Sequence, residues 1–320
     1  MISLVIPLYN EEETIVRLVP RLQQLLKGRP EQWEVLFVND GSKDATATLI
    51  RELLPVIQGA KLINLSRNFG QQAAYRAGLD HATGDAVIFL DADLQDPPEL
   101  IPEMIEKWKA GAMLVTGCRR KRQEGGVKGF LFWLFHEVFF RFTGGVMPKN
   151  SGTFALMDRL IIAHLKKMPE LNLFLPALRS WVGFEQAVVH YDRESREGEA
   201  KQTFSKLFSY AWDGITSFSD VPLKLISLLG LCVSLVGFTY ALWLLVARLL
   251  QFAGFLTELK VQGFTTVAVA IFCLSGVQLI CLGVIGEYIA RIYREVKARP
   301  IYIVDNIQDP GSSDRKGITG

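Results

Sequence analysis

The sequence predicts an α/β protein, in which a doubly wound, mostly parallel sheet is followed by amphipathic helices and a hairpin of two transmembrane helices. Within residues 1–120, short β-rich runs alternate with helical stretches, an order that is typical of a sheet covered by helices on both faces. Later in the chain, residues 223–245 and 264–285 form two apolar runs, each about as long as the roughly 20 residues that a membrane span requires.

The elements of the sheet domain follow from this alternation. Strands are predicted at 2–8, 33–39, 61–65, 86–90 and 113–116, and helices at 13–27, 44–57, 71–82 and 100–110. Ligands of doubly wound sheets bind beyond the carboxyl ends of the strands. Because polar residues follow each of the first four strands, we expect the site at that edge. For some of these residues a purely structural role is the alternative, turn formation for Gly41 and Gly70 and helix capping for Asp44.

An acidic segment follows the fourth strand. Asp91, Asp93 and Gln95 occupy alternate positions, and we expect them to share one side of an extended segment. Their oxygens suit Mg²⁺ or Mn²⁺ as ligands. Because substrate phosphates commonly complete the coordination of such a cation, the segment predicts a diphosphate substrate. The ordinary alternative is that the carboxylates cap the next helix, since short acidic motifs often have no function.

Composition excludes several classes of protein. The net charge is +2 over 320 residues, which gives no indication of a nucleic-acid partner. The four cysteines lack metal-binding spacing, and no signal peptide opens the chain, so we expect a reduced, cytosol-facing catalytic part. No strand is followed by the glycine pattern of dinucleotide-binding folds or by a P-loop. Phosphates must therefore be bound through a metal and side chains.

The expected membrane part begins with an amphipathic interfacial helix at 201–222. It is followed by the two spans within 223–290 and by a tail, 291–320, in which residues 305–320 carry no pattern that predicts a helix or strand. Basic residues flank the hairpin on both outer sides, which predicts that both termini and the catalytic domain, residues 1–200, lie in the cytoplasm. Paired spans also favour a homo-oligomer. The flanking residues are Lys201, Lys206, Lys224, Arg291, Arg294, Lys297 and Arg299.

Residues 126–142 form a strongly aromatic run with a few charges. The run is too short and too charged for a comfortable span, so it is interpreted as an interfacial or acceptor-contacting helix, with a buried core helix as the alternative. His136 lies within it without a second histidine at ligand spacing, which favours a packing role.

Several motifs in order resemble the GT-A catalytic domain of glycosyltransferase family 2. They lie at 5–12, 38–44, 68–70 and 91–98, and agreement continues at 181–184, 193–201 and 217–219 into the two-span carboxyl terminus. The chain looks most like the polyisoprenyl-phosphate branch of that family, which includes dolichyl-phosphate mannose synthase and the bacterial polyprenyl-phosphate glucosyltransferases.

The resemblance implies roles for individual residues. Asp91, Asp93 and Gln95 would hold the metal on the donor diphosphate, and Arg119 would touch its phosphates. A second group would line the nucleotide pocket: Pro7, Tyr9, Glu11 and Asp40. A third group would bind the lipid phosphate, although a solvated mixed-charge loop is the alternative for that stretch: Arg193, Arg196 and Lys201.

The chain departs from the family pattern at two positions. Thr153 stands where many relatives carry an aspartate in Gly-Asp-Phe, and Ala200 precedes Lys201 where they usually have serine. A lipid phosphate is already anionic at neutral pH, so no general base is required. Asp158 is a candidate substitute for the missing carboxylate, with a helix-start aspartate as its ordinary interpretation.

The resulting hypothesis is an inverting, metal-dependent transfer of one hexose from a nucleotide diphosphate sugar to a polyprenyl phosphate such as undecaprenyl phosphate, at the cytoplasmic membrane face. UDP-glucose is the preferred donor, and GDP-mannose and UDP-aminosugars are alternatives. Two other functions remain open. A processive polysaccharide synthase is expected to have Gln-x-x-Arg-Trp and more spans, whereas a non-catalytic membrane scaffold has no use for the acidic segment.

Overall fold

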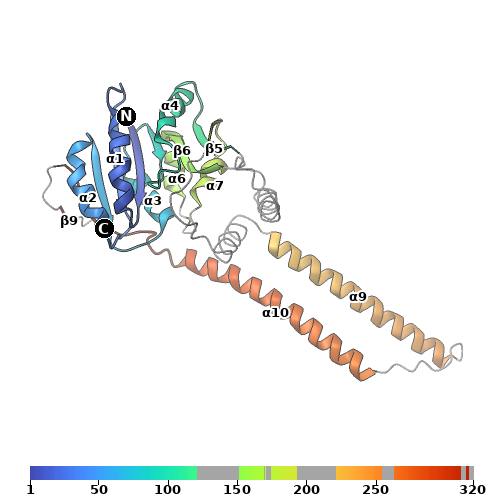
Figure 1. Cartoon of the computed structure of the whole chain (residues 1–320). Coiled ribbons are helices and arrows are strands. Elements are labelled where there is room, and N and C mark those ends of the chain that lie inside the picture. The colour runs from blue at the N-terminus through green and yellow to red at the C-terminus, as the bar shows by residue number, and fades with distance from the viewer. Residues whose placement is uncertain are drawn as a thin grey trace. The chain divides into compact units, whose positions relative to one another are not determined.

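The computed structural model describes residues 1–120, 151–168, 170, 174–192, 221–253, 263–310 and 315–316. The chain divides into two compact units, one comprising Met1–Ala211 with Arg299–Gly320 and the other Trp212–Ala298. Figure 1 shows a sheet flanked by helices in the first unit and two long helices in the second. The predicted boundary at residue 291 differs from this division, because the residues after the hairpin return to the sheet unit.

The first unit contains a nine-stranded mixed sheet with the order β7-β5-β6-β4-β1-β2-β3-β8-β9. Parallel pairing joins β1 to β2 and β4, β2 to β3, and β5 to β7. Strand β6 runs antiparallel between β4 and β5, and β8 runs antiparallel beside β3. The strands are β1 (Ile2–Leu8), β2 (Trp33–Asn39), β3 (Ala60–Leu65), β4 (Ala86–Phe89), β5 (Leu114–Arg119), β6 (Ser151–Asp158), β7 (Gln186–Tyr191), β8 (Val304–Gln308) and β9 (Arg315–Lys316).

Helices cover both faces of this sheet. One face buries a core of alternate strand residues, such as Leu4 and Phe37, against α1, α2 and α4, and the opposite face is covered by α3, with α6 and α7 packing near β6. The helices are α1 (Glu12–Leu26), α2 (Thr46–Leu53), α3 (Gln71–His81), α4 (Ile101–Lys109), α6 (Arg159–Lys167) and α7 (Leu175–Trp181), with short 3₁₀ turns at Leu54–Val56 and Pro98–Leu100. The doubly wound α/β fold predicted from the sequence is confirmed.

Helix α3 lies unusually close to the sheet. A Cβ atom on Gly78 would come within 2.2 Å of Val5 Cγ1 and 3.2 Å of Val38 Cγ2, so only glycine fits at this contact. The first turns of α3 lie beside the acidic segment that follows β4, since Gln71 and Tyr75 both hydrogen-bond to Asp91.

Strand β8 corrects the expectation that the carboxyl-terminal tail lacks regular structure. It pairs with β3, and the backbone N–H of Ser66 also donates to the carbonyl oxygen of Ile303 at 2.9 Å. The short sequence Val-Asp-Asn-Ile-Gln has no continuous apolar run that would predict a strand, so its conformation depends on pairing with an existing edge.

The second unit consists of α9 (Val221–Phe252) and α10 (Gly263–Val296), which contact each other. Within them Ile226–Leu244 and Leu274–Val296 are apolar and long enough to cross a membrane. The two-helix hairpin agrees with the prediction, although α10 extends beyond residue 290. Much of the predicted amphipathic helix, residues 201–220, lies outside the described residues, as do the aromatic run at 126–142 and His136.

Candidate active site

The site lies at the carboxyl edge of the central parallel strands, where the loops after β1 and β2 are joined to each other. The backbone N–H of Asn10 donates to Ser42 Oγ at 3.0 Å, and the N–H of Lys43 donates to Asn10 Oδ1 at 2.9 Å. Asn10 has a φ of +54°, a left-handed conformation that asparagine tolerates better than most residues. The two loops therefore form one fixed wall of the site.

The residues expected in the nucleotide pocket lie along this wall. Pro7 is buried in β1, whereas Tyr9, immediately after the strand, is 41% exposed and available to a ligand. Glu11 Oε2 accepts a hydrogen bond from the Thr14 hydroxyl at 2.7 Å, which fixes its side chain at the start of α1.

Asp40 joins the loop after β2 to the loop after β3. Its Oδ1 accepts from the backbone N–H of Phe69 at 2.7 Å and its Oδ2 from that of Gly70 at 2.8 Å. Burial raises the pKa of Asp40, although these hydrogen bonds oppose the shift. Gly41, at φ +65°, packs so closely that a Cβ there would meet Arg67 C at 2.5 Å. Asp40 therefore shapes the loop as well as lining the predicted pocket.

Asp91 is held by three neutral donors from two elements. Gln71 Nε2 and the Tyr75 hydroxyl, both on α3, donate to Oδ1 at 2.6 Å each, and the Thr153 hydroxyl on β6 donates to Oδ2 at 3.0 Å. Burial raises the pKa of Asp91, and the nearby carboxylates of Asp96 and Asp93 add to the increase against the hydrogen bonds. A divalent cation would relieve this repulsion between carboxylates.

The acidic segment is not extended, and in this respect the sequence prediction was wrong. Ala92 and Asp93 lie in a turn, and Leu94 has a φ of +57°, which is strained for a residue with a Cβ. The backbone N–H of Gln95 donates to Asp93 Oδ1 at 3.1 Å and closes the turn. A local side chain to backbone hydrogen bond thus prevails over continuation of the strand.

The donor set fits a hard cation. Asp93 Oδ2 and the Gln95 amide make no hydrogen bond to other parts of the chain that the structure describes, so both remain available as oxygen ligands. Within the described ranges, no three His, Cys, Asp or Glu side chains are grouped closely enough to hold a metal. Two aspartates and an amide are nonetheless sufficient for Mg²⁺, which commonly keeps substrate phosphates and water as its other ligands.

Arg119 lies at the end of β5 and points to the same edge. Its guanidinium donates from Nη2 to Asp96 Oδ1 at 3.4 Å and from Nε to the Tyr191 hydroxyl at 3.3 Å. The Tyr191 hydroxyl also donates to Asp96 Oδ1. Asp96 and Tyr191 were not identified from the sequence as site residues.

Arg179 supports the β6 side of the site from α7. It is 1% exposed, and it donates to the carbonyl oxygens of Thr153 at 2.7 Å and Gly152 at 2.6 Å. Burial lowers the pKa of the Arg179 guanidinium to about 10. The strand segment that carries Thr153 is therefore anchored by a buried cation.

Asp158 lies away from these residues. It pairs with Ala86, the first residue of β4, whereas Asp91 follows the opposite end of that strand. Its two carboxylate oxygens accept from the backbone N–H of Leu160 at 2.9 Å and from Trp108 Nε1 at 2.8 Å. Asp158 is the N-cap of α6, and its position does not support a catalytic role as a replacement for the family aspartate.

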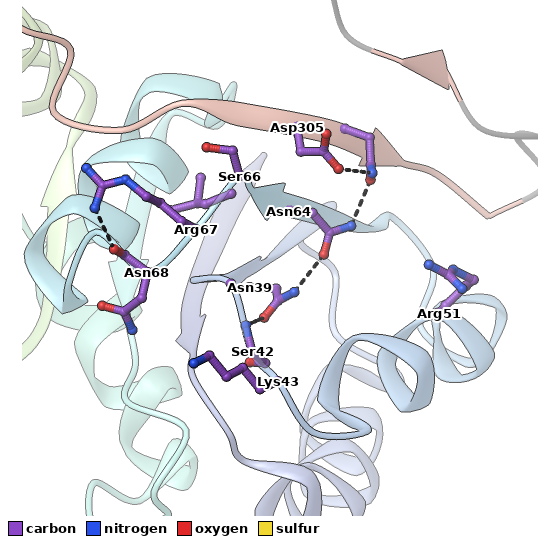
Figure 2. Close-up of a pocket in the computed structure, with 12 residues that line it drawn as sticks. Asn39, Ser42, Lys43, Arg51, Asn64, Ser66, Arg67, Asn68 and Asp305 are labelled. Carbon is purple, nitrogen blue, oxygen red and sulfur yellow. Dashed lines mark hydrogen bonds between the residues drawn. The ribbon is translucent and has the colours of Figure 1, made fainter.

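A polar pocket of about 500 Å³ opens next to this site, at the ends of β2, β3 and β8. Figure 2 shows the side chains of Asn39 and Asn64 side by side in it. They belong to a row of three asparagines, in which Asn39 Nδ2 donates to Asn64 Oδ1 and Asn64 Nδ2 donates to Asn306 Oδ1, both at 2.8 Å. Asn39 Oδ1 accepts from the backbone N–H of Ser42 at 3.0 Å. The row connects β8 to the loop after β2.

The residues expected to bind the acceptor phosphate, Arg193, Arg196 and Lys201, lie outside the described residues. The residues predicted to bind the donor all lie at the same edge of the sheet. Among the predicted site residues that the structure describes, only Asp158 lies elsewhere.

Comparisons with known proteins identify the class of this molecule. Residues 3–165 match Glycosyl transferase family 2, and residues 221–292 match the GtrB C-terminal hairpin. The chain is therefore a glycosyltransferase enzyme. It belongs to glycosyltransferase family 2, among the members whose sheet domain is followed by this hairpin.

Its relatives match over almost their whole length. An uncharacterized glycosyltransferase of Synechocystis is 44% identical, over 96% of this chain and 95% of its own. The SfII prophage-derived bactoprenol glucosyl transferase of Shigella flexneri is 42% identical over 95% and 97%, and the prophage bactoprenol glucosyl transferase homolog of Escherichia coli is 40% identical over 96% and 99%. Among solved structures, mannosyl-3-phosphoglycerate synthase from Rubrobacter xylanophilus is 19% identical, covers 82% of this chain and 78% of its own, and has a TM-score of 0.47.

Proposed function

We propose that the chain transfers a single hexose, glucose from UDP-glucose, to a polyprenyl phosphate such as undecaprenyl phosphate. The observation that carries this proposal is the full-length similarity to bactoprenol glucosyl transferases, which includes both the sheet domain and the hairpin. The two apolar helices support a membrane location, as a lipid acceptor requires. The basic residues outside both ends of the hairpin favour a catalytic domain and termini on the cytoplasmic face of the plasma membrane.

The donor diphosphate would bind at the acidic turn. Asp91, Asp93 and Gln95 would hold Mg²⁺ or Mn²⁺ there, and the bound cation would neutralise charge on the departing diphosphate. Arg119 would pair with the same phosphates, because its planar guanidinium matches phosphate oxygens and keeps its charge. Tyr9, Glu11 and Asp40, with Pro7 beneath them, would form the wall of the nucleotide pocket.

The acceptor phosphate would attack directly. One of its oxygens forms a bond to the anomeric carbon while the bond from that carbon to the diphosphate breaks, which releases UDP and inverts the configuration. Arg193, Arg196 and Lys201 would align the acceptor phosphate through charge-assisted hydrogen bonds. No general base is needed, since the attacking oxygen is already anionic near neutral pH.

The proposal is tested by the transfer of radiolabelled sugar into organic-extractable lipid. Detergent-solubilised full-length protein is incubated with undecaprenyl phosphate and a panel of UDP- and GDP-sugars, with parallel samples in EDTA. We expect label from UDP-glucose alone, abolished by EDTA and restored by Mg²⁺ or Mn²⁺. Label from a different donor would overturn the choice of sugar, and label that persists in EDTA would overturn the metal site.

The variant Asp93→Asn supplies the matched test of the acidic turn. Because it preserves shape and removes one ligand charge, we expect transfer to fall by at least about a hundredfold, while thermal unfolding remains close to wild type. The control Asp192→Asn alters an exposed carboxylate that lies 3.5 Å from Arg120, and it should transfer sugar normally. Equal activity of Asp93→Asn and Asp192→Asn would contradict the metal assignment.

A further inference from the structure

Two strand ends meet Asp96 in a small cluster beside the acidic turn. Asp96 follows β4, Arg119 ends β5 and Tyr191 ends β7, and Asp96 Oδ1 accepts hydrogen bonds from both of the others. Asp96 is 1% exposed, and its second oxygen, Oδ2, is buried without a partner in the part of the chain that the structure describes. A buried carboxylate with so few donors depends strongly on each of them.

The Tyr191 side chain is well placed to be one of these donors. Its ring packs edge-on against Phe154, with centroids 6.1 Å apart, and Gly117 leaves the room for both rings. Burial, together with the adjacent Asp96 carboxylate, raises the pKa of Tyr191, so the hydroxyl keeps its proton near neutral pH. The hydroxyl donates a hydrogen bond to Asp96 Oδ1 and accepts one from Arg119 Nε at 3.3 Å.

These contacts restrict Arg119. A free arginine side chain samples many rotamers, and binding a phosphate in one of them costs side-chain entropy. Here Nε and Nη2 are both engaged from one side, by Tyr191 and Asp96, so the guanidinium is held before the donor arrives. The remaining edge of the planar group can then face a phosphate.

We propose that Tyr191 is a positioning residue, which orients Arg119 toward the donor diphosphate directly and through Asp96. This inference rests on the proposed role of Arg119 in binding the donor. The described hydrogen bonds of the Tyr191 side chain are to Arg119 and Asp96, so the proposal assigns to the end of β7 an indirect function in donor binding.

A double-mutant cycle between Tyr191→Phe and Arg119→Gln tests the proposal. Tyr191→Phe removes one hydroxyl and retains the packing ring, and thermal unfolding checks that each variant is folded. Calorimetry of detergent-solubilised full-length protein measures the Kd of UDP with Mn²⁺, and transfer assays measure kcat and KM for UDP-glucose. We expect Tyr191→Phe to weaken UDP binding about threefold to tenfold, because it removes the hydrogen bonds that orient the Arg119 guanidinium. In the Arg119→Gln background the same change should alter the Kd less than about twofold.

The outcomes separate this inference from the proposed function. If Arg119→Gln leaves UDP affinity and transfer unchanged, the proposed role of Arg119 fails. If Arg119→Gln weakens UDP binding but Tyr191→Phe has no effect, or has the same effect in both backgrounds, the positioning role fails, because a purely structural contribution adds independently. Asp192→Asn, next to Tyr191 in sequence but exposed, serves as the control and should leave the Kd unchanged.

Discussion

At the scale of single residues, Thr153 supplies a neutral hydrogen-bond donor where the resemblance to the family implied an aspartate. Its hydroxyl donates to Asp91 Oδ2 at 3.0 Å, whereas a carboxylate in its place would put two negative groups in contact. Arg179 fixes the backbone of the same residue through the Thr153 carbonyl oxygen. Thr153 therefore stabilises Asp91 as a hydrogen-bond donor rather than acting as a base.

Replacing Thr153 tests this role. Thr153→Val removes the hydroxyl at nearly constant volume and leaves Asp91 Oδ2 without its donor, so we expect a loss of about 1–3 kcal/mol in stability. Thr153→Ser retains the hydroxyl and should lose much less. Thermal unfolding of the detergent-solubilised protein measures the difference, and equal melting temperatures for the valine and serine variants would show that the hydrogen bond contributes nothing.

Glu34 predicts a pH-dependent contribution to stability. Burial disfavours its charge, but hydrogen bonds from Ser3, Thr83 and Lys61 outweigh burial and lower the pKa of Glu34 from its usual 4.5. A lowered folded-state pKa stabilises the protein above pH 4.5, and this stabilisation is lost as the pH falls through the folded value. Glu34→Gln should therefore lower stability by about 1–3 kcal/mol at neutral pH.

The same comparison in acid supplies the control. Once the pH has fallen below the lowered folded-state pKa of Glu34, the wild-type carboxyl is protonated and resembles the glutamine, so the two melting temperatures should converge. A difference that stays constant between neutral and acid pH would mean that shape, and not charge, accounts for the effect of the substitution.

The residue contacts show what sequence reasoning identifies and what it misses. Asp91, Asp93 and Arg119 were predicted because their spacing and family motifs carry a chemical meaning. Tyr75 and Thr153 were missed as partners of Asp91, since they lie 16 and 62 residues away in the chain and have no motif of their own. Contacts between residues distant in the chain depend on the order of the strands in the sheet, and the periodicity of apolar residues does not determine that order.

At the scale of elements, the regular strands and helices of residues 1–120 were predicted closely. β1 and β2 match their predicted ranges, and the helices shift by one or two residues at most ends, because apolar periodicity is strong there. No strand was predicted at β6 or β7, and the acidic turn and β8 were also missed. The turn and β8 are each set by interactions outside their own sequence pattern: a hydrogen bond from the Gln95 N–H to Asp93 in the turn, and pairing with β3 for β8.

The asparagine row predicts that β8 contributes to stability through its side chains as well as its backbone. Asn306→Ala removes the acceptor for Asn64 Nδ2, and Asn64 is only 8% exposed, so its amide would lose a hydrogen bond without free access to water. We expect a loss of about 1–2 kcal/mol by thermal unfolding. Asp305→Asn, at an exposed neighbouring position, should have little effect, and a larger loss from Asp305→Asn would contradict this account.

At the scale of the whole molecule, one chain combines a sugar-transfer domain with a two-helix apolar hairpin. Strand β8, which follows the hairpin in sequence, belongs to the catalytic sheet, so the chain enters and leaves the hairpin from the same folded unit. This arrangement suits an enzyme whose donor is water-soluble and whose acceptor stays in the bilayer. Sequence patterns predicted the hairpin from apolar length alone, but its return into the sheet depends on tertiary pairing.

In the proposed reaction, cleavage of the donor is coupled to a lipid phosphate acceptor. The most direct measurement is UDP release from UDP-glucose by the full-length protein in detergent, with and without undecaprenyl phosphate, in the presence of Mn²⁺. We predict UDP release that depends on undecaprenyl phosphate and is lost in Asp93→Asn. UDP released at the same rate without the lipid phosphate, or no release in its presence, would contradict the account.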